Sequence, residues 1–97
     1  MARRIVWSKK AETVFIKILE YYNHRNESNV YSRKLNSEIK KHLELLSNHP
    51  WIGLKTENKN TRVLIKHHFK IFYRIEPETI VILLIWDSRQ NPENLNL

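Results

Sequence analysis

The spacing of the hydrophobic residues changes once along this 97-residue chain, at Thr61. Before that point apolar residues recur every three or four positions, as in amphipathic helices, and after it they alternate, as in strands. The strand-forming Ile5-Val6-Trp7 precedes the first helical pattern. We therefore predict an α+β fold of order β-α-α-β-β-β, in which a helical hairpin packs on one face of a small, curved, mostly antiparallel sheet.

The two helices are bounded by capping residues and by a break in their pattern. The first strand covers 3–7, and Ser8 is predicted to cap the first helix by accepting a hydrogen bond from a free backbone N–H. Residues 23–27 break the pattern, and Ser28 is predicted to cap a second helix that ends at about Ser47. The predicted core stripe of the two helices consists of Ala11, Val14, Phe15, Ile18, Leu19, Tyr22, Tyr31, Leu35, Ile39, Leu43 and Leu46.

The second half of the chain reads as a loop followed by a three-stranded meander. Residues 48–60 contain a proline and the only glycine, and are predicted to form a loop. In the first strand, Val63 and Ile65 are predicted to face the core. In the second, the predicted core residues are Phe69, Ile71, Tyr73 and Ile75. After a turn at 76–79, the all-apolar run 80–86 is predicted to be a central strand, covered by the helices on one face and by the curved sheet or a partner on the other.

The charge balance points to a negatively charged partner. Lys and Arg outnumber Asp and Glu by 17 to 10, which gives a net charge of +7 and favours nucleic acid or an acidic protein. The chain has no cysteine, so disulfides and thiolate metal sites are excluded. Its longest apolar run is too short for a bilayer. We expect a single domain, 1–97, with a flexible tail at 90–97, a cytoplasmic location and no membrane contact.

The five histidines do not follow a metal-binding spacing, so neither a metal nor a small-molecule cofactor is expected. A single glycine also excludes the usual phosphate-binding loops. Cleavage of RNA through its own 2′-hydroxyl needs fewer groups: cations for the phosphate, a proton donor and a proton acceptor. His68, in the predicted connection between two strands near Arg62, is a candidate acid or base because histidine titrates near neutrality.

Cations are concentrated in the loop and the strands. The candidate residues for binding a nucleic acid or another target are Lys55, Lys59, Arg62, Lys66, Lys70, Arg74, Trp86 and Arg89. Four of them, Arg62, Lys66, Lys70 and Arg74, are predicted to lie opposite the core, where Phe72 and Trp86 add stacking surfaces.

For most of the lysines a solvated sheet face is the competing interpretation. Arg62 and Arg89 are stronger candidates, because an arginine at a strand end can bind phosphate or carboxylate bidentately. Arg89 has an alternative role as the partner of Asp87 or Glu93.

Taken together, several short motifs resemble the RelE/ParE superfamily of bacterial toxins over about residues 4–92. They are Val6-Trp7-Ser8 with Ala11, Tyr21-Tyr22, His49-Pro50 with Gly53, Arg62-Val63-Leu64, Phe69-Lys70-Ile71-Phe72-Tyr73, and the strand 80–86 followed by Arg89. The resemblance implies a cytoplasmic toxin of a type II toxin–antitoxin module that a cognate antitoxin neutralises by direct binding. It also implies one of two targets, since RelE-like members cleave messenger RNA on the ribosome and ParE-like members inhibit DNA gyrase.

The resemblance slightly favours the gyrase inhibitor. RelE-like members hold RNA with basic residues, here Lys55, Lys59, Lys70 and Arg89, and usually carry a tyrosine or histidine near the C-terminus. Residues 90–97 contain neither. The alternative is a ribosome-dependent messenger RNA endonuclease with Arg62, His68 and Arg89 as candidate catalytic residues. A second alternative is a basic nucleic-acid-binding module without toxin activity. Whether the protein is an enzyme stays open at this point.

Overall fold

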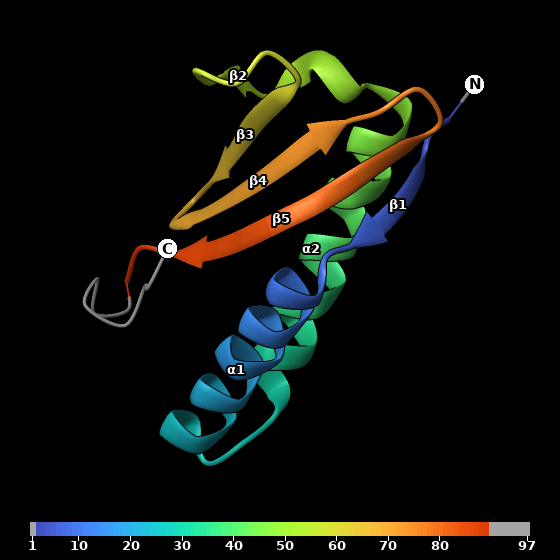
Figure 1. Cartoon of the computed structure of the whole chain (residues 1–97). Coiled ribbons are helices and arrows are strands. Elements are labelled where there is room, and N and C mark those ends of the chain that lie inside the picture. The colour runs from blue at the N-terminus through green and yellow to red at the C-terminus, as the bar shows by residue number, and fades with distance from the viewer. Residues whose placement is uncertain (1, 90–97) are drawn as a thin grey trace.

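The computed structural model describes residues 2–89, so the tail predicted to be flexible, 90–97, lies outside the described residues. The predicted α+β architecture is confirmed: two helices pack against one face of a sheet (Figure 1). The elements in chain order are β1 (Arg4–Trp7), α1 (Lys9–Asn26), α2 (Val30–Asn48), the short 3₁₀ helix η1 (Pro50–Ile52), β2 (Leu54–Lys55), β3 (Thr61–Lys66), β4 (Phe69–Ile75) and β5 (Thr79–Asp87).

The sheet has five strands in the order β1-β5-β4-β3-β2. All neighbouring pairs are antiparallel except β1 and β5, which run parallel with Trp7 opposite Ile82. The apolar β5 lies inside the sheet between β1 and β4, as predicted, and its Ile80, Ile82 and Ile85 are fully buried. On the face away from the helices, Val81 and Trp86 of β5 stay partly exposed.

The start of α1 follows the prediction, whereas its end does not. The Ser8 hydroxyl accepts a hydrogen bond from the Ala11 N–H at 3.0 Å and so caps the helix. The predicted break at 23–27 is wrong for 23–26, because α1 continues to Asn26. The helix ends at Glu27, whose left-handed backbone (φ 51°) lets its N–H bond back to carbonyls of the last turn.

The start of α2 lies close to its predicted position. Its N-cap is Asn29, one residue after the predicted cap. The Ser28 hydroxyl still accepts a hydrogen bond from the Val30 N–H at 3.2 Å. The end of α2 at Asn48 agrees with the predicted end near Ser47.

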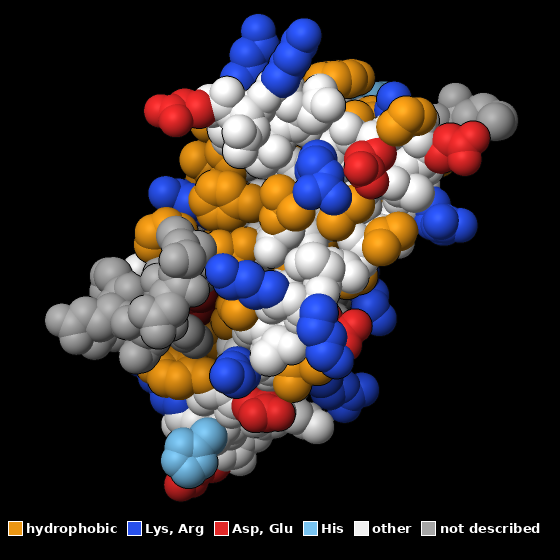
Figure 2. Space-filling model, viewed as in Figure 1, with side chains coloured by type: hydrophobic (Ala, Val, Ile, Leu, Met, Phe, Trp, Pro, Cys, Tyr) orange, Lys and Arg blue, Asp and Glu red, His pale blue; other side chains and the backbone are white. Residues whose placement is uncertain are grey.

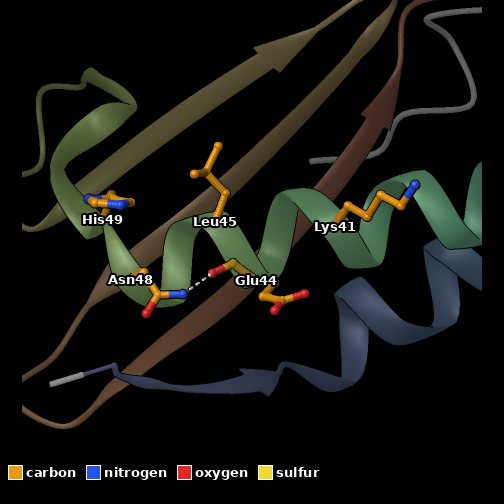
Figure 3. Close-up of a pocket in the computed structure, with 5 residues that line it drawn as sticks. All are labelled: Lys41, Glu44, Leu45, Asn48 and His49. Carbon is orange, nitrogen blue, oxygen red and sulfur yellow. Dashed lines mark hydrogen bonds between the residues drawn. The ribbon is translucent and has the colours of Figure 1, made fainter.

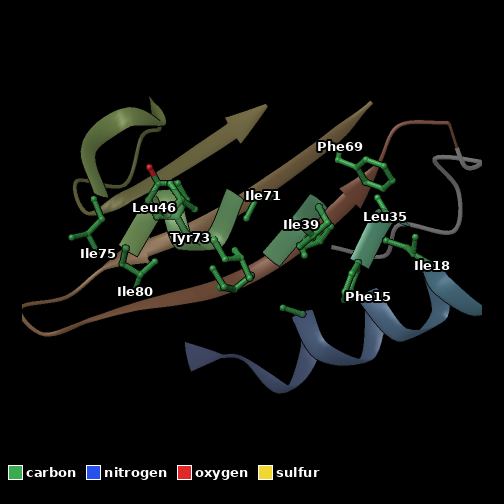
Figure 4. Close-up of a cluster of buried hydrophobic side chains, with 14 of the residues drawn as sticks. Phe15, Ile18, Leu35, Ile39, Leu46, Phe69, Ile71, Tyr73, Ile75 and Ile80 are labelled. Carbon is green, nitrogen blue, oxygen red and sulfur yellow. The ribbon is translucent and has the colours of Figure 1, made fainter. Parts of the chain in front are cut away.

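The hydrophobic core lies between the two helices and the sheet (Figure 4). Trp7 at the end of β1 stacks on Phe15 of α1, with 5.4 Å between ring centroids. Burying one large aliphatic side chain contributes roughly 1.5–3 kcal/mol, so this cluster supplies most of the driving force for folding. Its buried members are Ala11, Phe15, Ile18, Tyr22, Leu35, Ile39, Leu43, Leu46, Phe69, Ile71, Tyr73, Ile75, Ile80, Ile82 and Ile85.

The predicted loop at 48–60 is partly wrong, because it contains η1 and β2. A buried tyrosine organises this segment: the Tyr73 hydroxyl donates to the Pro50 carbonyl at 2.7 Å and accepts from the Gly53 N–H at 2.9 Å. Glycine is required there, since a Cβ on Gly53 would contact the Tyr73 hydroxyl and lie 2.9 Å from its Cε1. The contact to Tyr73 therefore brings Leu54 and Lys55 alongside β3.

The predicted facing of β3 is also wrong. Arg62 lies opposite Tyr73 and Leu64 lies opposite Ile71, so these residues share the helix-covered face with the core of β4. Val63 and Ile65 lie on the other face. The run 63–65 is entirely apolar and fits either facing, so the pairing with β4 determines the outcome. Consequently Arg62 does not share a face with Lys70 and Arg74 as predicted, and neither does Lys66.

Candidate functional site

A buried carboxylate marks the end of β5. The side chain of Asp87 lies on the same, helix-covered face of the sheet as that of Ile85 and is only 1% exposed. A charge buried in this way requires hydrogen-bond donors. The Tyr22 hydroxyl, from the last part of α1, donates to one oxygen of Asp87, and the Arg89 backbone N–H donates to the other at 2.9 Å. The carboxylate thereby joins the first helix to the last strand across 65 residues of sequence.

Two tyrosines hold the guanidinium of Arg89. Its Nε and Nη2 donate to the Tyr22 hydroxyl at 3.2 and 2.8 Å, and Nη2 lies 3.4 Å from the hydroxyl of Tyr31 in the first turn of α2. Its Cζ lies 5.2 Å from the Tyr22 ring centroid and 5.8 Å from that of Tyr31, within cation–π range. The hydrogen bonds to Tyr22 hold the guanidinium in place and also raise the pKa of Arg89, which favours its charged form.

His68 lies beside this cation in the turn between β3 and β4. Its Nε2 is 3.5 Å from the Tyr31 hydroxyl and 3.8 Å from an Asp87 oxygen. Partial burial and the charge of Arg89 lower the pKa of His68 below 6.5, although Asp87 acts in the opposite direction. The imidazole is therefore mostly neutral at pH 7.

The Tyr22 hydroxyl remains protonated throughout the physiological range. Burial, followed by the hydrogen bond to Asp87, raises the pKa of Tyr22 to about 12. Tyr22 thus serves as a hydrogen-bond donor to Asp87 and as an acceptor from Arg89, a role that requires the neutral phenol.

Arg62 lies elsewhere, next to η1 and β2. Its Nη1 donates to the carbonyls of Trp51 and Gly53, each at 3.0 Å, and its Cζ lies 5.0 Å from the Trp51 ring. The extended strand from Arg62 to Lys66 spans about 13 Å, and His68 lies beyond its end. The structure therefore brings His68 and Arg89 together, but not with Arg62.

The other candidate residues are spread over the sheet. Lys70, Phe72, Arg74 and Trp86 lie on the open face, by which we mean the face of the sheet away from the helices. On this face Lys70 Nζ is 5.2 Å from the Trp86 ring, and Arg74 pairs with Glu76 at 3.5 Å. Figure 2 shows hydrophobic side chains gathered on the side of the strands facing the viewer, with Lys and Arg among them.

The three remaining lysines do not join either site. Lys55 lies opposite Arg62 in β2, Lys59 lies between β2 and β3, and Lys66 ends β3; all three are exposed.

A separate hollow of about 480 Å³ follows the C-terminal half of α2 (Figure 3). There the Asn48 side-chain amide donates to the Glu44 carbonyl at 3.1 Å. Lys41 and Glu44 give it opposite charges, and no predicted site residue lines it. Between residues 2 and 89, no three His, Cys, Asp or Glu side chains come together in a metal-binding arrangement. No helix in that range has the length and apolar character needed to cross a membrane.

The tyrosine partners of Arg89 are absent from the sequence-based candidates. Tyr22 and Tyr31 were predicted only as core residues, because they continue the apolar stripes of the helices. Periodicity does not indicate the facing of Asp87 either: this residue faces the core because the pairing of β4 with β5 shifts register at Phe72/Tyr73. A buried carboxylate requires a polar partner from the layer above it, and here the tyrosine of an apolar helix stripe supplies one through its hydroxyl.

Comparisons with known proteins agree on the family and the fold. Two solved structures have this fold: the chromosomal ParDE toxin–antitoxin system from P. aeruginosa (20% identity, TM-score 0.73) and the RelBE2 toxin–antitoxin complex from Mycobacterium tuberculosis (18% identity, TM-score 0.64). The first match covers 87% of this chain and 94% of the other, and the second covers 88% and 96%. No curated protein sequence matches the chain significantly. The family model of the ParE toxin of the type II toxin–antitoxin system parDE matches residues 5–92, and the chain therefore belongs to this family of toxins.

Proposed function

We propose that this toxin arrests growth by binding DNA gyrase and does not cleave RNA. The observation that carries the proposal is the separation of the three candidate catalytic residues. Arg62 is bound to backbone carbonyls beside β2, whereas His68 and Arg89 lie beyond the far end of β3. Cleavage of one phosphodiester requires several cations and proton-transfer groups to converge on a single phosphate; His68 and Arg89 lie together but without Arg62, and this arrangement favours binding over catalysis.

The open face has the composition of a protein-binding surface. It combines Phe72 and Trp86 with Lys70 and Arg74, and aromatic and arginine side chains are the residues most enriched at binding hot spots. The membership of the chain in the ParE family supports gyrase as the target, because gyrase is the target that the ParE-like resemblance implies.

We also propose that an antitoxin neutralises the toxin in the cytoplasm. Both structural neighbours are toxin–antitoxin assemblies, which supports a partner of the same kind here. A net charge of +7 would speed association with an acidic antitoxin and fits such a partner.

A supercoiling assay with purified gyrase tests the target. We expect the purified toxin to inhibit supercoiling, and the double substitution Lys70→Ala/Trp86→Ala to raise the half-inhibitory concentration at least about tenfold, because it removes an aromatic anchor and its cation. Lys17→Ala, on the exposed side of α1, is the matched control and should change that concentration less than about twofold.

Mapping of transcript 5′ ends after toxin induction supplies the opposing outcome. We expect no new ends. Translation-dependent cuts in messenger RNA, lost on Arg89→Ala or His68→Ala, would instead establish the endonuclease and overturn the proposal. Induction without any effect on growth would favour a nucleic-acid-binding module without toxin activity.

A further inference from the structure

A pocket of about 230 Å³ adjoins the fixed cation, between α2 and the β3–β4 turn. Tyr31 and His68 line it together with Leu35 and Phe69, and its wall is completed by Lys34, Glu38 and His67. We call it the Tyr31 pocket. Arg89 borders it through its contact with the Tyr31 hydroxyl.

Three hydrogen-bonding groups meet at this pocket with only long contacts between them. The Tyr31 hydroxyl is 3.4 Å from Arg89 Nη2 and 3.5 Å from His68 Nε2. Both distances are at the outer limit for a hydrogen bond, so the hydroxyl can turn toward a better partner at little cost. Tyr31, Arg89 and His68 thus form a set of groups that an incoming acceptor could bind together.

The positive charge of Arg89 is held in place without a direct carboxylate contact among the described residues. The side-chain oxygens that accept from its guanidinium are the hydroxyls of Tyr22 and Tyr31. Asp87 stays close, but its oxygens accept from the Tyr22 hydroxyl and from the Arg89 backbone N–H. A guanidinium oriented by neutral phenols keeps its affinity for an external oxyanion.

We propose that the Tyr31 pocket binds a carboxylate side chain of the antitoxin, with the carboxylate oxygens accepting from Arg89 and from Tyr31. The inference rests on the proposed antitoxin and not on gyrase as the target. Leu35 and Phe69 give the pocket apolar side chains, and the opposite charges of Lys34 and Glu38 on its wall offset each other, which leaves the single charge of Arg89 for an incoming anion. A single carboxylate flanked by apolar side chains fits this environment better than the consecutive phosphates of a nucleic acid.

The affinity of the purified toxin for a candidate antitoxin, the product of a short acidic reading frame beside its gene, tests the inference. We expect Arg89→Ala to weaken binding at least about tenfold and Tyr31→Phe to weaken it by a few fold, because each removes a donor to the carboxylate. Arg89→Lys should restore only part of the loss, since an ammonium cannot bind a carboxylate bidentately. Lys10→Ala, in the first turn of α1 and remote from Tyr22, changes the net charge equally and should leave the affinity within about twofold.

Two further measurements can overturn the inference. The first is an NMR titration of the isolated toxin with acetate, inorganic phosphate or a short single-stranded RNA. We expect acetate and phosphate to shift the His68 ring signals. We expect RNA to shift them no more strongly than phosphate does. RNA binding that Arg89→Ala abolishes, with antitoxin affinity unchanged, would assign the pocket to nucleic acid.

Equal losses of thermal stability in Arg89→Ala and Glu93→Gln, again with antitoxin affinity unchanged, would assign the cation to the chain's own tail and also overturn the inference. Gyrase inhibition is not measured in either experiment, so the inference can fail without the proposed target failing.

Discussion

Two arginine–tyrosine pairs lie in different parts of the molecule, and they differ in the groups to which they hydrogen-bond. Beside β2, the Tyr73 hydroxyl bonds to the backbone of Pro50 and Gly53, and Arg62 donates to two backbone carbonyls. At the end of β5, the Tyr22 hydroxyl bonds to the side chains of Asp87 and Arg89. Polar groups satisfied by the backbone hold the fold together, whereas two charged side chains that are linked through a tyrosine hydroxyl can exchange partners.

The difference extends to exposure. Tyr73 is fully buried and its hydroxyl has both a donor and an acceptor within the protein. Tyr22 is equally buried, but the guanidinium bound to it is exposed. The Arg62–Tyr73 pair is therefore structural, whereas the Arg89–Tyr22 pair connects a buried hydroxyl to an exposed guanidinium.

Gly53→Ala should cause the largest loss of stability, because it disturbs the Tyr73 hydroxyl that bonds to the backbone of Pro50 and Gly53. The added Cβ would collide with the Tyr73 ring and hydroxyl, which we expect to lower the free energy of unfolding by about 3 kcal/mol. For a domain of this size that corresponds to a fall in Tm of roughly 12–24 °C, measurable by circular dichroism. In a Tyr73→Phe background the added cost of Gly53→Ala should be smaller, and strictly additive effects would contradict the proposed clash.

Tyr22→Phe should cause a smaller loss of stability, at the hydroxyl that bonds to the side chains of Asp87 and Arg89. It leaves the buried Asp87 carboxylate without its phenol donor, so we expect a loss of about 2 kcal/mol in urea unfolding. The neighbouring Tyr21 is 46% exposed, and Tyr21→Phe should stay within about 0.5 kcal/mol of the unsubstituted protein. Equal losses in the two variants would mean that the Asp87 contact does not stabilise the fold.

The alkaline pH dependence of stability should show the smallest effect. The pKa of Tyr22 rises from 10.0 to about 12 on folding, so the folded state retains the proton more strongly than the unfolded state. Its contribution is complete below pH 10 and is lost as the pH rises from 10 to 12. At pH 11 we expect the unsubstituted protein to have lost about 1 kcal/mol more than Tyr22→Phe, measured by urea unfolding. Parallel pH profiles for the two proteins would contradict this assignment.

The sequence predicted the elements whose pattern is strong and local. The amphipathic stripes of the helices and the alternation of β4 each have one facing that buries the apolar residues, and both were confirmed. The run Val63-Leu64-Ile65 is apolar throughout and could bury either set of side chains, so the pairing with β4 determines which of them face the helices. The strand β2 is only two residues long and is held by a contact with Tyr73, twenty positions away from Gly53.

The candidate site could be predicted only in part for the same reason. Arg89 stood out as an arginine after a strand, and the structure adds what holds it. Tyr22 and Asp87 meet across 65 residues, and neither position by itself indicates the contact: Tyr22 continues an apolar stripe, and Asp87 follows an apolar run whose facing the sequence leaves open. A contact of this kind depends on how the helix lies on the sheet, and local periodicity carries no information about that placement.

The parallel pairing of β1 with β5 has a consequence for the synthesis of the protein. The first strand of the chain finds its neighbour only in the last one, and the Ser8 hydroxyl reaches the Leu83 carbonyl across 75 residues. Contacts so distant in sequence form late and slow down folding. A nascent chain therefore keeps the edge of β1 unpaired until β5 has been made, and the same final strand carries Asp87 and leads into Arg89. The completed sheet and the fixed cation consequently arise together, once β5 and Arg89 have been made.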